Sequence, residues 1–351
     1  MATFSIDNIA IKGMACCVPK NTEHNKDLTM LSQEEIQKFI DATGVEQRRI
    51  ASDNICTSDL CCEAAEKLLK DLNWNKEDIQ ILVFVSQTGD YILPVSSAIL
   101  QDRLGLSTDC IAFDVPLGCS GYVYGMSIIA SMMKATGLKK GLLLAGDTSS
   151  KLLSKTDKST IPLFGDAGSA TAFEYEANAE KMFFDLGSDG SGYKTIIVND
   201  GGSRNRINAE SLTYQTISPG IERNECQLVL DGMDVFSFGI SQAPKTINKL
   251  TEKFDINKDN VDFFVFHQAN LMMNKMIVKK LKLPTEKVPY SLPKFGNTSS
   301  TTIPLTIVTE LKNSIENQNK KMIICGFGVG LSWGSALISF DKVFISELLE
   351  I

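Results

Sequence analysis

The chain has 351 residues, of which 43% are apolar and 22% charged, so it can bury the core of two ordinary domains. This composition excludes a disordered or collagen-like protein. The net charge of −7, from 35 basic and 42 acidic residues, argues against a nucleic-acid-binding surface spread over the whole fold.

The first residues, MATFSIDNIAIKGM, lack the charged segment and long apolar run of a signal peptide. Residues 115–133 are uncharged but contain a proline, three glycines and several serines, so we do not expect them to span a membrane. The nine cysteines, an odd number, are expected to be reduced thiols in a cytoplasmic protein. With only two histidines and no Cys-x-x-Cys motif, we expect no metal site.

Three segments of the first half of the chain recur in the same order in the second half. Residues 75–85 resemble 257–267, residues 142–146 resemble 322–326, and residues 168–173 resemble 334–340. Each copy predicts helices alternating with short, continuously apolar strands, a pattern typical of a sheet covered on both faces. We therefore predict an α/β protein built from two copies of one unit, residues 1–180 and 181–351, with a functional site where their loops meet.

The boundary between the copies is expected near residues 175–185. Residues 187–208 are rich in Gly, Ser, Asn and Asp and are predicted to form a loop, and turn-forming residues continue to position 225.

Cys119 follows a Pro-Leu-Gly segment and precedes the uncharged run SGYVYGMSIIASMM. Apolar residues surround this run on all sides, which predicts a buried central helix with Cys119 at its N-terminus. The free N–H groups and dipole of a helix N-terminus stabilise a thiolate and lower the pKa of the thiol. Cys119 is thus either a nucleophile or a small core residue.

His267 ends the apolar run VDFFVF, at the edge where ligand-facing loops begin in an α/β fold. Val85 stands at the equivalent position of the first copy, so the core itself does not require a histidine there. A catalytic and a structural histidine are both consistent with this position. His24, in a polar segment, is predicted to lie on the surface.

Asn297 lies in the segment FGNTSS, where Gly-Asn is also an ordinary turn and Asn can cap a helix. The glycine-spaced segment 326–332 follows an apolar strand and leads into another strand. It therefore favours a loop that offers a backbone N–H to an oxyanion over a phosphate-binding loop.

Taken together, DVPLGCSGYVYGM, FHQANL, FGNTSS and FGVGLSWGSALISF resemble the cysteine, histidine, asparagine and C-terminal motifs of the β-ketoacyl-acyl carrier protein synthase III family. GVEQRRIA, LFGDAGSA and LGSDGSG resemble further landmarks of that family. The resemblance spans nearly the whole chain and implies a thiolase-like fold, with two duplicated βαβαβαββ halves in a layered α-β-α-β-α structure. Residues 199–228 look like an insertion relative to compact members.

The resemblance implies acyl transfer to Cys119, with the backbone N–H groups of Cys119 and Val329 holding the oxyanion. A malonyl group on acyl carrier protein then binds to His267 and Asn297, loses CO2 and condenses to a β-ketoacyl thioester. No cofactor is implied beyond these thioester substrates. The pathway is either fatty-acid initiation or a specialised secondary one.

The resemblance also implies a homodimer, in which Leu93 of one subunit and Phe327 line the acyl pocket. Lys275, Lys279 and Lys280, on a predicted helix, are either a patch for acyl carrier protein or a solvated helix face. Members of primary metabolism carry a tryptophan and arginines that hold CoA at positions occupied here by Lys38, Ala42, Met272 and Lys158. Lysine reproduces neither the stacking of tryptophan nor the paired contacts of arginine. The acyl donor, CoA or carrier protein, is therefore left open.

Two alternatives remain. One is an acyltransferase of the same type that moves an acyl group to a hydroxyl or amine without condensation. The other is a non-enzymatic partner subunit, which the presence of Cys119, His267 and Asn297 disfavours. Neither nucleic acid nor a membrane is expected as a partner.

Overall fold

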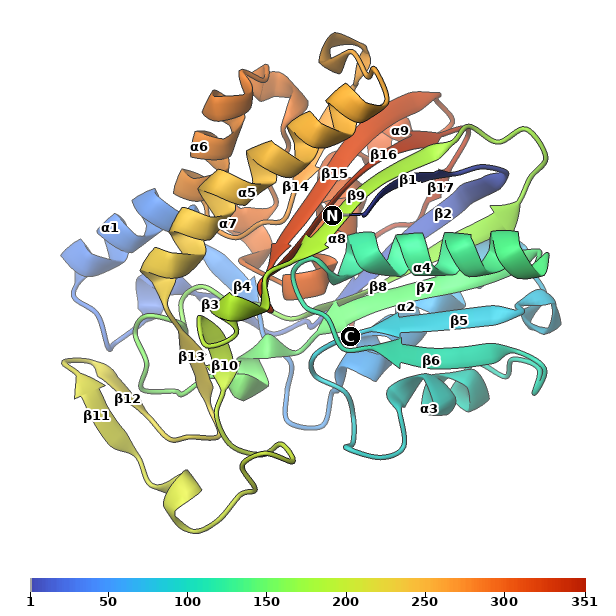
Figure 1. The fold of residues 1–351 in the computed structure, drawn as a ribbon. Helices are drawn as coiled ribbons and strands as arrows, with labels where there is room; N and C mark the ends of the chain where they lie inside the picture. The colour runs from blue at the N-terminus through green and yellow to red at the C-terminus, as the bar shows by residue number, and fades with distance from the viewer. Residues whose placement is uncertain (1) are drawn as a thin grey trace.

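Two β-sheets organise the protein in the computed structural model, which describes residues 2–351 (Figure 1). The seven-stranded sheet runs in the order β17-β2-β8-β7-β5-β6, with β18 also paired to β2. The five-stranded sheet has the order β1-β9-β16-β15-β14. The strands of the first sheet are β2 (Ile9–Val18), β5 (Ile81–Val85), β6 (Ile111–Val115), β7 (Lys140–Asp147), β8 (Ala167–Tyr175), β17 (Phe344–Ile345) and β18 (Leu349–Glu350). Those of the second are β1 (Ala2–Ile6), β9 (Met182–Ser188), β14 (Phe263–Phe266), β15 (Lys320–Gly328) and β16 (Ser332–Phe340).

The strand pairing repeats between the sheets. β5 is parallel to β7 and β7 is antiparallel to β8; likewise β14 is parallel to β15 and β15 is antiparallel to β16. These are the strands formed by the recurring segments of the sequence. The chain ends cross between the copies, since β1 joins the second sheet and β17 and β18 join the first. A division into residues 1–180 and 181–351 stays a prediction.

The helices complete an α-β-α-β-α arrangement of layers, as Figure 1 shows. α4 (Gly121–Thr136) and α8 (Thr302–Glu310) lie between the sheets and contact both. α2 (Thr57–Asp71) and α3 (Ser96–Arg103) cover the outer face of the first sheet, and α5 (Gly232–Lys253) and α6 (Leu271–Leu281) cover that of the second. The predicted layered thiolase-like fold is confirmed. The shorter elements are α1 (Gln33–Thr43), α7 (Leu292–Phe295), α9 (Lys312–Ile315), β3 (Thr22–His24) and β4 (Gln47–Arg49).

The central helix α4 forms because its sequence suits burial on every side. It begins after Ser120 and ends at Gly137, whose φ of 78° places it in the left-handed region that ends many helices. Tyr122, Met126 and Met133 are fully buried within it. The predicted buried central helix is confirmed, and Cys119 lies immediately before its first turn.

The segment predicted as a continuous loop contains short strands instead. β10 (Ile196–Val198) pairs with β13 (Leu228–Leu230), and β11 (Gln215–Ser218) pairs with β12 (Ile221–Arg223). The apolar triplets of β10 and β13 are short and lie among Gly, Ser and Asn residues, and they form a ladder only because the two segments, about thirty residues apart, meet in the fold. β11 and β12 are mostly polar and form a local hairpin. The lobe formed by residues 199–228 is anchored through buried Asp157, which accepts a hydrogen bond from Arg223 at 3.4 Å.

Within residues 2–351, no helix combines the length and apolar character needed to cross a membrane.

Candidate active site

Cys119, His267 and Asn297 line one cavity of about 210 Å³ at the seam between the two halves. Cys119 comes from the start of α4, His267 from the end of β14, and Asn297 from the loop after α7. Val329 and Phe327 line the same cavity. Residues from both copies therefore meet at one place, as the repeat predicts.

Cys119 is held between the start of α4 and the end of β15. A Cβ atom at Gly326 would lie 2.7 Å from the carbonyl oxygen of Cys119, and one at Gly328 would lie 2.8 Å from its sulfur. Only glycine permits this approach. The backbone N–H groups of Val329 and Cys119 lie close enough to the sulfur of Cys119 to favour its thiolate form. Two backbone donors thus converge on the atom that would carry an acyl group.

Burial raises the pKa of the Cys119 thiol to about 11, and the negative charge of Asp147 acts in the same direction. The N–H of Val329 and the hydroxyl of Ser299 oppose this effect without cancelling it. The predicted lowering of the pKa by the helix N-terminus is therefore wrong, because removal of the thiolate from water outweighs the nearby donors. The resting residue is a thiol and needs a proton acceptor when it reacts.

His267 is almost fully buried, with 2% of its surface exposed. Its backbone N–H donates to the carbonyl of Cys325 at 2.8 Å, and its Nδ1 lies 2.7 Å from the hydroxyl oxygen of Thr302. Its ring packs edge-on against Phe327, with ring centroids 5.6 Å apart. Burial lowers the pKa of His267 to about 3, so the imidazole is neutral at physiological pH.

Asn297 is oriented by its own backbone and by Ser299. Its N–H donates to the carbonyl of Leu163 at 2.9 Å, and its carbonyl accepts from the N–H of Gly165 at 3.0 Å. Its Oδ1 accepts from the N–H of Ser299 at 2.9 Å, which fixes the orientation of the amide. Nδ2 has no hydrogen-bond partner among residues 2–351, so this NH2 group remains free to donate into the cavity.

Asp147, at the end of β7, is a fully buried cavity residue that the sequence analysis missed. Its carboxylate accepts from the N–H of Gln87 at 2.8 Å and from the hydroxyl of Ser300 at 2.7 Å. Burial raises the pKa of Asp147 despite these donors. The sequence did contain one signal for Asp147, since it is a charged residue directly after the apolar run GLLLAG. Ser299 and Thr302 gave no comparable signal, because they lie in a run of similar polar residues.

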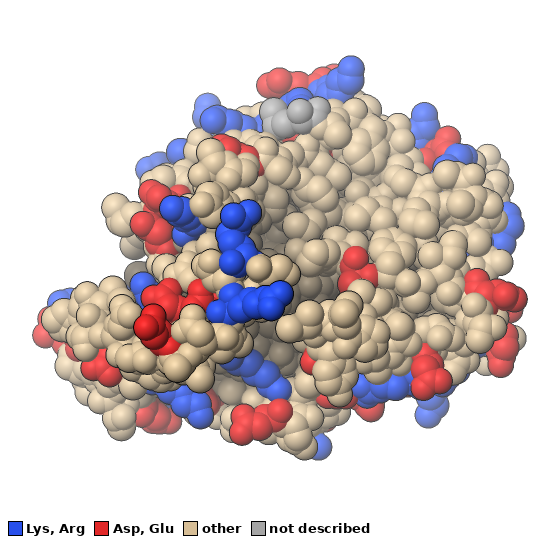
Figure 2. Space-filling model, turned by 60° about the horizontal axis from the view of Figure 1, so that its bottom comes forward, with Lys and Arg blue, Asp and Glu red and all other residues tan. Residues whose placement is uncertain are grey.

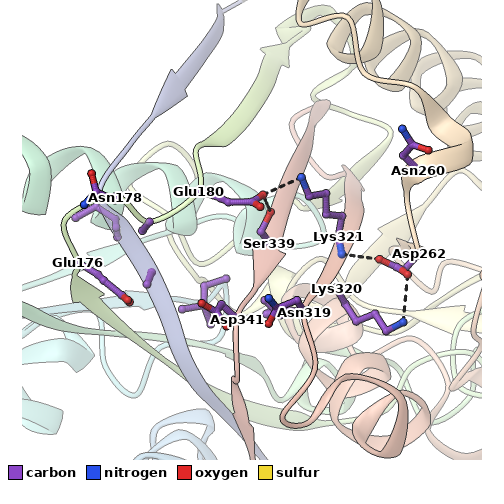
Figure 3. Close-up of a pocket in the computed structure, with 15 residues that line it drawn as sticks. Glu176, Asn178, Glu180, Asn260, Asp262, Asn319, Lys320, Lys321, Ser339 and Asp341 are labelled. Atoms are coloured by element: carbon purple, nitrogen blue, oxygen red, sulfur yellow. Dashed lines mark hydrogen bonds and ion pairs between the residues drawn. The ribbon is translucent and has the colours of Figure 1, made fainter.

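A second cleft lies at the opposite end of β15, around Lys320 and Lys321 (Figure 3). Its charges are largely paired with one another. Lys321 lies 3.0 Å from Glu180, and Lys320 lies 3.3 Å from Asp262. No buried side chain of this cleft lacks a partner within residues 2–351. The cavity that contains Cys119 is therefore the candidate active site.

Comparison with known proteins agrees with this choice. Residues 113–190 match the family model for 3-oxoacyl-[acyl-carrier-protein (ACP)] synthase III, and residues 251–340 match the one for its C-terminal part. The β-ketoacyl-[acyl-carrier-protein] synthase III of Fusobacterium nucleatum is 31% identical over 95% of this chain and 99% of its own. Synthase III 1 of Bacillus cereus is 31% identical over 95% of this chain and 100% of its own.

The chain belongs to the β-ketoacyl-acyl carrier protein synthase III family. A crystal structure of 3-oxoacyl-(acyl-carrier protein) synthase from Burkholderia xenovorans is also similar, with a TM-score of 0.92 and 36% identity over 100% of this chain and 99% of its own. The protein is thus an acyl-transferring enzyme of the synthase III type, as the motifs predict.

The other predicted site residues of this synthase III chain lie outside the cavity of the single chain. Leu93, which is predicted to reach the pocket of a second subunit, is 82% exposed. Lys275 and Lys279 are exposed on α6, whereas the amino group of Lys280 donates to the carbonyl of Ile240 at 3.0 Å. His24 is exposed, as predicted.

The residues at the expected CoA positions of synthase III form local ion pairs or remain exposed. Lys38 lies 2.6 Å from Glu34 within α1, and Lys158 lies 3.3 Å from Glu35. Met272 is 50% exposed. Phe39 and Thr43, from the same helix α1, line the cavity instead.

Proposed function

We propose that this enzyme accepts an acyl group on Cys119 and then condenses it with a malonyl thioester in a decarboxylating reaction. The observation that carries the proposal is the convergence of a sulfur, two backbone N–H donors, an imidazole and a free amide group in one cavity. Acyl transfer and condensation need these groups together, whereas a non-catalytic subunit does not.

In the first half-reaction, the sulfur of Cys119 attacks the carbonyl of an acyl thioester. The carbonyl oxygen gains negative charge, which the N–H groups of Cys119 and Val329, both near the sulfur, would stabilise. The thiol of the donor leaves, and the acyl group remains on Cys119. Because this covalent step separates two substrates, ping-pong kinetics are expected.

In the second half-reaction, loss of CO2 from the malonyl group places negative charge on its thioester oxygen. The NH2 group of Asn297 and the ring of His267 are the side chains that would hold this oxygen. Asn297 suits the role since its amide stays neutral at every working pH. The resulting carbanion attacks the acyl group on Cys119, and the β-ketoacyl thioester leaves.

The cavity walls favour an apolar acyl chain or linker. Phe327 packs beside His267, and further apolar side chains line the rest of the wall, including Leu228 and Leu230 from β13. They are Leu152, Leu163, Phe164, Ile196, Leu228 and Leu230. No cofactor is proposed, because the thioester substrates supply all the atoms of both steps.

We propose acyl carrier protein as the partner, in keeping with the names of the relatives. Lys275 and Lys279, four residues apart on α6, offer two exposed positive charges for an acidic carrier, with Lys280 beside them. In Figure 2, Lys and Arg side chains also border a hollow beside the lobe formed by residues 199–228. The side chains of Lys38 and Met272 favour a carrier-borne donor over CoA, since neither stacks on the nucleotide nor pairs with its phosphates in the manner of tryptophan or arginine.

We also propose a homodimer that forms through the region around Leu93. Tyr91, Ile92 and Leu93 are 68%, 90% and 82% exposed, an unusual cluster for a monomer surface. β6 is an open edge of its sheet and lies in the same region of the sequence. A second subunit would cover both features and would bring its own Leu93 toward this cavity. A cytoplasmic location is proposed because the cysteines between residues 2 and 351 are all free thiols.

The experiment is to incubate the enzyme with a panel of acyl-CoA and acyl-carrier thioesters and to locate the acyl group by mass spectrometry, then to add malonyl carrier protein and measure CO2. We expect acylation at Cys119 followed by CO2 release. Cys119→Ala should abolish labelling, while Cys226→Ala, which alters a half-buried cysteine in the lobe, should not. Acylation without CO2 release, with transfer to a hydroxyl or amine, would establish the acyltransferase alternative instead.

A further inference from the structure

Two polar side chains of the cavity have no hydrogen-bond partner within residues 2–351, and neither half-reaction uses them. Ser149 lines the cavity and is only 7% exposed, yet its hydroxyl bonds to no other group among the described residues. Gln87 lines the same cavity, and its carboxamide likewise has no partner in that part of the chain. A polar group beside a cavity is costly to leave unpaired. These two side chains therefore mark a place in the wall where a ligand can supply the missing bonds.

Gln87 and Ser149 follow neighbouring strands of the first sheet. β5 and β7 are parallel and paired, so the loops after them leave the sheet at the same edge. The N–H of Gln87 donates to the carboxylate of Asp147 at 2.8 Å, and the N–H of Thr148 donates to the hydroxyl of Thr88 at 2.9 Å. These bonds tie the two loops together. Both polar side chains are thus held at one end of the sheet.

The carboxamide of Gln87 lies beside the peptide that leads into Cys119. A Cβ atom at Gly118 would be 2.2 Å from Oε1 of Gln87 and 3.0 Å from its Cδ. The side chain of Gln87 therefore occupies the space that Gly118 leaves free. Because Gly118 immediately precedes Cys119, an acyl group on the sulfur would meet this amide within its first few carbons.

The chemistry of the two side chains suits an uncharged polar substituent. An amide and a hydroxyl can each donate and accept a hydrogen bond. Neither carries a charge, so they offer no counter-ion to a second carboxylate or to an ammonium group. The apolar side chains elsewhere in the cavity suit the remaining carbons of the chain. A short acyl group with a single hydroxyl satisfies both parts of the wall.

We propose that Gln87 and Ser149 determine specificity by binding a hydroxyl on the acyl group that Cys119 carries, so that the enzyme prefers a hydroxylated short-chain acyl donor to its alkyl counterpart. This inference rests on the proposed acylation of Cys119 and adds the class of acyl group. One side chain donates to the hydroxyl oxygen and the other accepts its proton. Gln87 is exposed in the single chain and precedes the segment 91–93, so the proposed second subunit would shield it from water.

The test uses two pairs of acyl groups in which a methyl group replaces the hydroxyl at nearly the same size. The pairs are 3-hydroxybutyryl (both enantiomers) with 3-methylbutyryl, and 4-hydroxybutyryl with pentanoyl, each loaded on the same acyl carrier protein. For at least one pair, we expect kcat/KM of Cys119 acylation to be about tenfold higher with the hydroxylated member, roughly the effect of one hydrogen bond. Equal values within both pairs, or higher values with the methyl members, would overturn the proposal.

Two variants remove the polar groups and leave the cavity open. Gln87→Met keeps the length of the side chain without its amide, and Ser149→Ala removes the hydroxyl. Each should abolish most of the preference for the hydroxylated acyl group. Thr43→Val is the matched control, because Thr43 also lines the cavity but its hydroxyl already donates to the carbonyl of Phe39 at 2.7 Å. It should keep the preference. An undiminished preference in both Gln87→Met and Ser149→Ala would also overturn the proposal.

A binding experiment separates this inference from the proposed function. Cys119→Ala cannot be acylated, so calorimetric titration with the same acyl carriers measures recognition alone. The hydroxylated member of the preferred pair should bind about tenfold more tightly, and adding Gln87→Met should remove that difference. If no donor acylates the wild type, the function proposed for Cys119 fails, but the titration still decides whether Gln87 recognises the hydroxyl.

Discussion

Gly328 and Cys119 lie so close together that a side chain at position 328 would compete with the sulfur for space. A Cβ atom there would be 2.8 Å from the sulfur and 2.7 Å from the Cβ of Cys119. Gly328 ends β15 in the second copy, whereas Cys119 precedes α4 in the first. This contact places the N–H of Val329 against the sulfur, and so the two copies together form the pair of backbone donors.

Gly328→Ala should therefore push β15 away from Cys119 and separate the two donors. Loss of one oxyanion donor costs about 10²–10³-fold in rate, and we expect acylation of Cys119 to slow by that amount. Gly190→Ala is the matched control, because nothing lies within 4 Å of a Cβ built at that position. Stopped-flow acylation rates of the two variants check this, and equal rates would contradict it.

Asp147→Asn should make the Cys119 thiol more acidic. The charge of Asp147 helps to raise the pKa of Cys119, so an uncharged amide should lower that pKa from about 11. At a fixed pH below the thiol pKa, alkylation of Cys119 by iodoacetamide should become several-fold faster. The folded protein should lose stability, since the amide NH2 would face N–H and O–H donors, at a cost of about 1–3 kcal/mol.

Asp185→Asn is the control for Asp147→Asn. Asp185 is equally buried but pairs with Lys249 at 2.9 Å in another part of the fold. It should cost stability without changing the alkylation rate of Cys119. Mass spectrometry of the alkylated peptide provides the readout, and an unchanged or slower rate for Asp147→Asn would count against the electrostatic effect.

His267 should make stability depend on pH on the acidic side. Its folded pKa of about 3 lies below the usual 6.5, so the unfolded chain binds a proton more readily than the folded one. Stability is then complete above pH 6.5 and falls as the pH drops toward 3, by at most about 1.4 kcal/mol per pH unit. His267→Gln should flatten this slope in urea unfolding, and His24→Gln, an exposed site, should not.

Ile92→Glu should convert the proposed dimer into monomers. Ile92 is 90% exposed in the single chain, so a charge there costs nothing unless a second subunit covers it. Sedimentation velocity should show the mass fall by half and acyl transfer should weaken. Ile207→Glu, at a 59% exposed position in the 199–228 lobe, should leave the mass unchanged. A wild-type protein that sediments as a monomer would refute the dimer.

Lys275→Glu combined with Lys279→Glu should raise the KM for a carrier-borne substrate and leave the rate with a short acyl-CoA unchanged. Both lysines are exposed on α6, so reversing their charge should affect docking and not folding. Lys70→Glu reverses one exposed charge on α2, away from α6, and provides the control for a charge reversal elsewhere on the surface. An equal effect on both donors would place these lysines outside the docking surface.

The sequence by itself determined the duplicated strands, the buried helix after Cys119 and the family, because these depend on local apolar patterns and on motifs that stay contiguous in the chain. Only the tertiary structure decided the environment of each reactive group. Burial reversed the expected acidity of Cys119, and Asp147, Ser299 and Thr302 reached the site from separate elements. Dehydration and hydrogen-bond partners depend on residues distant in the chain, so no local pattern in the sequence contains them.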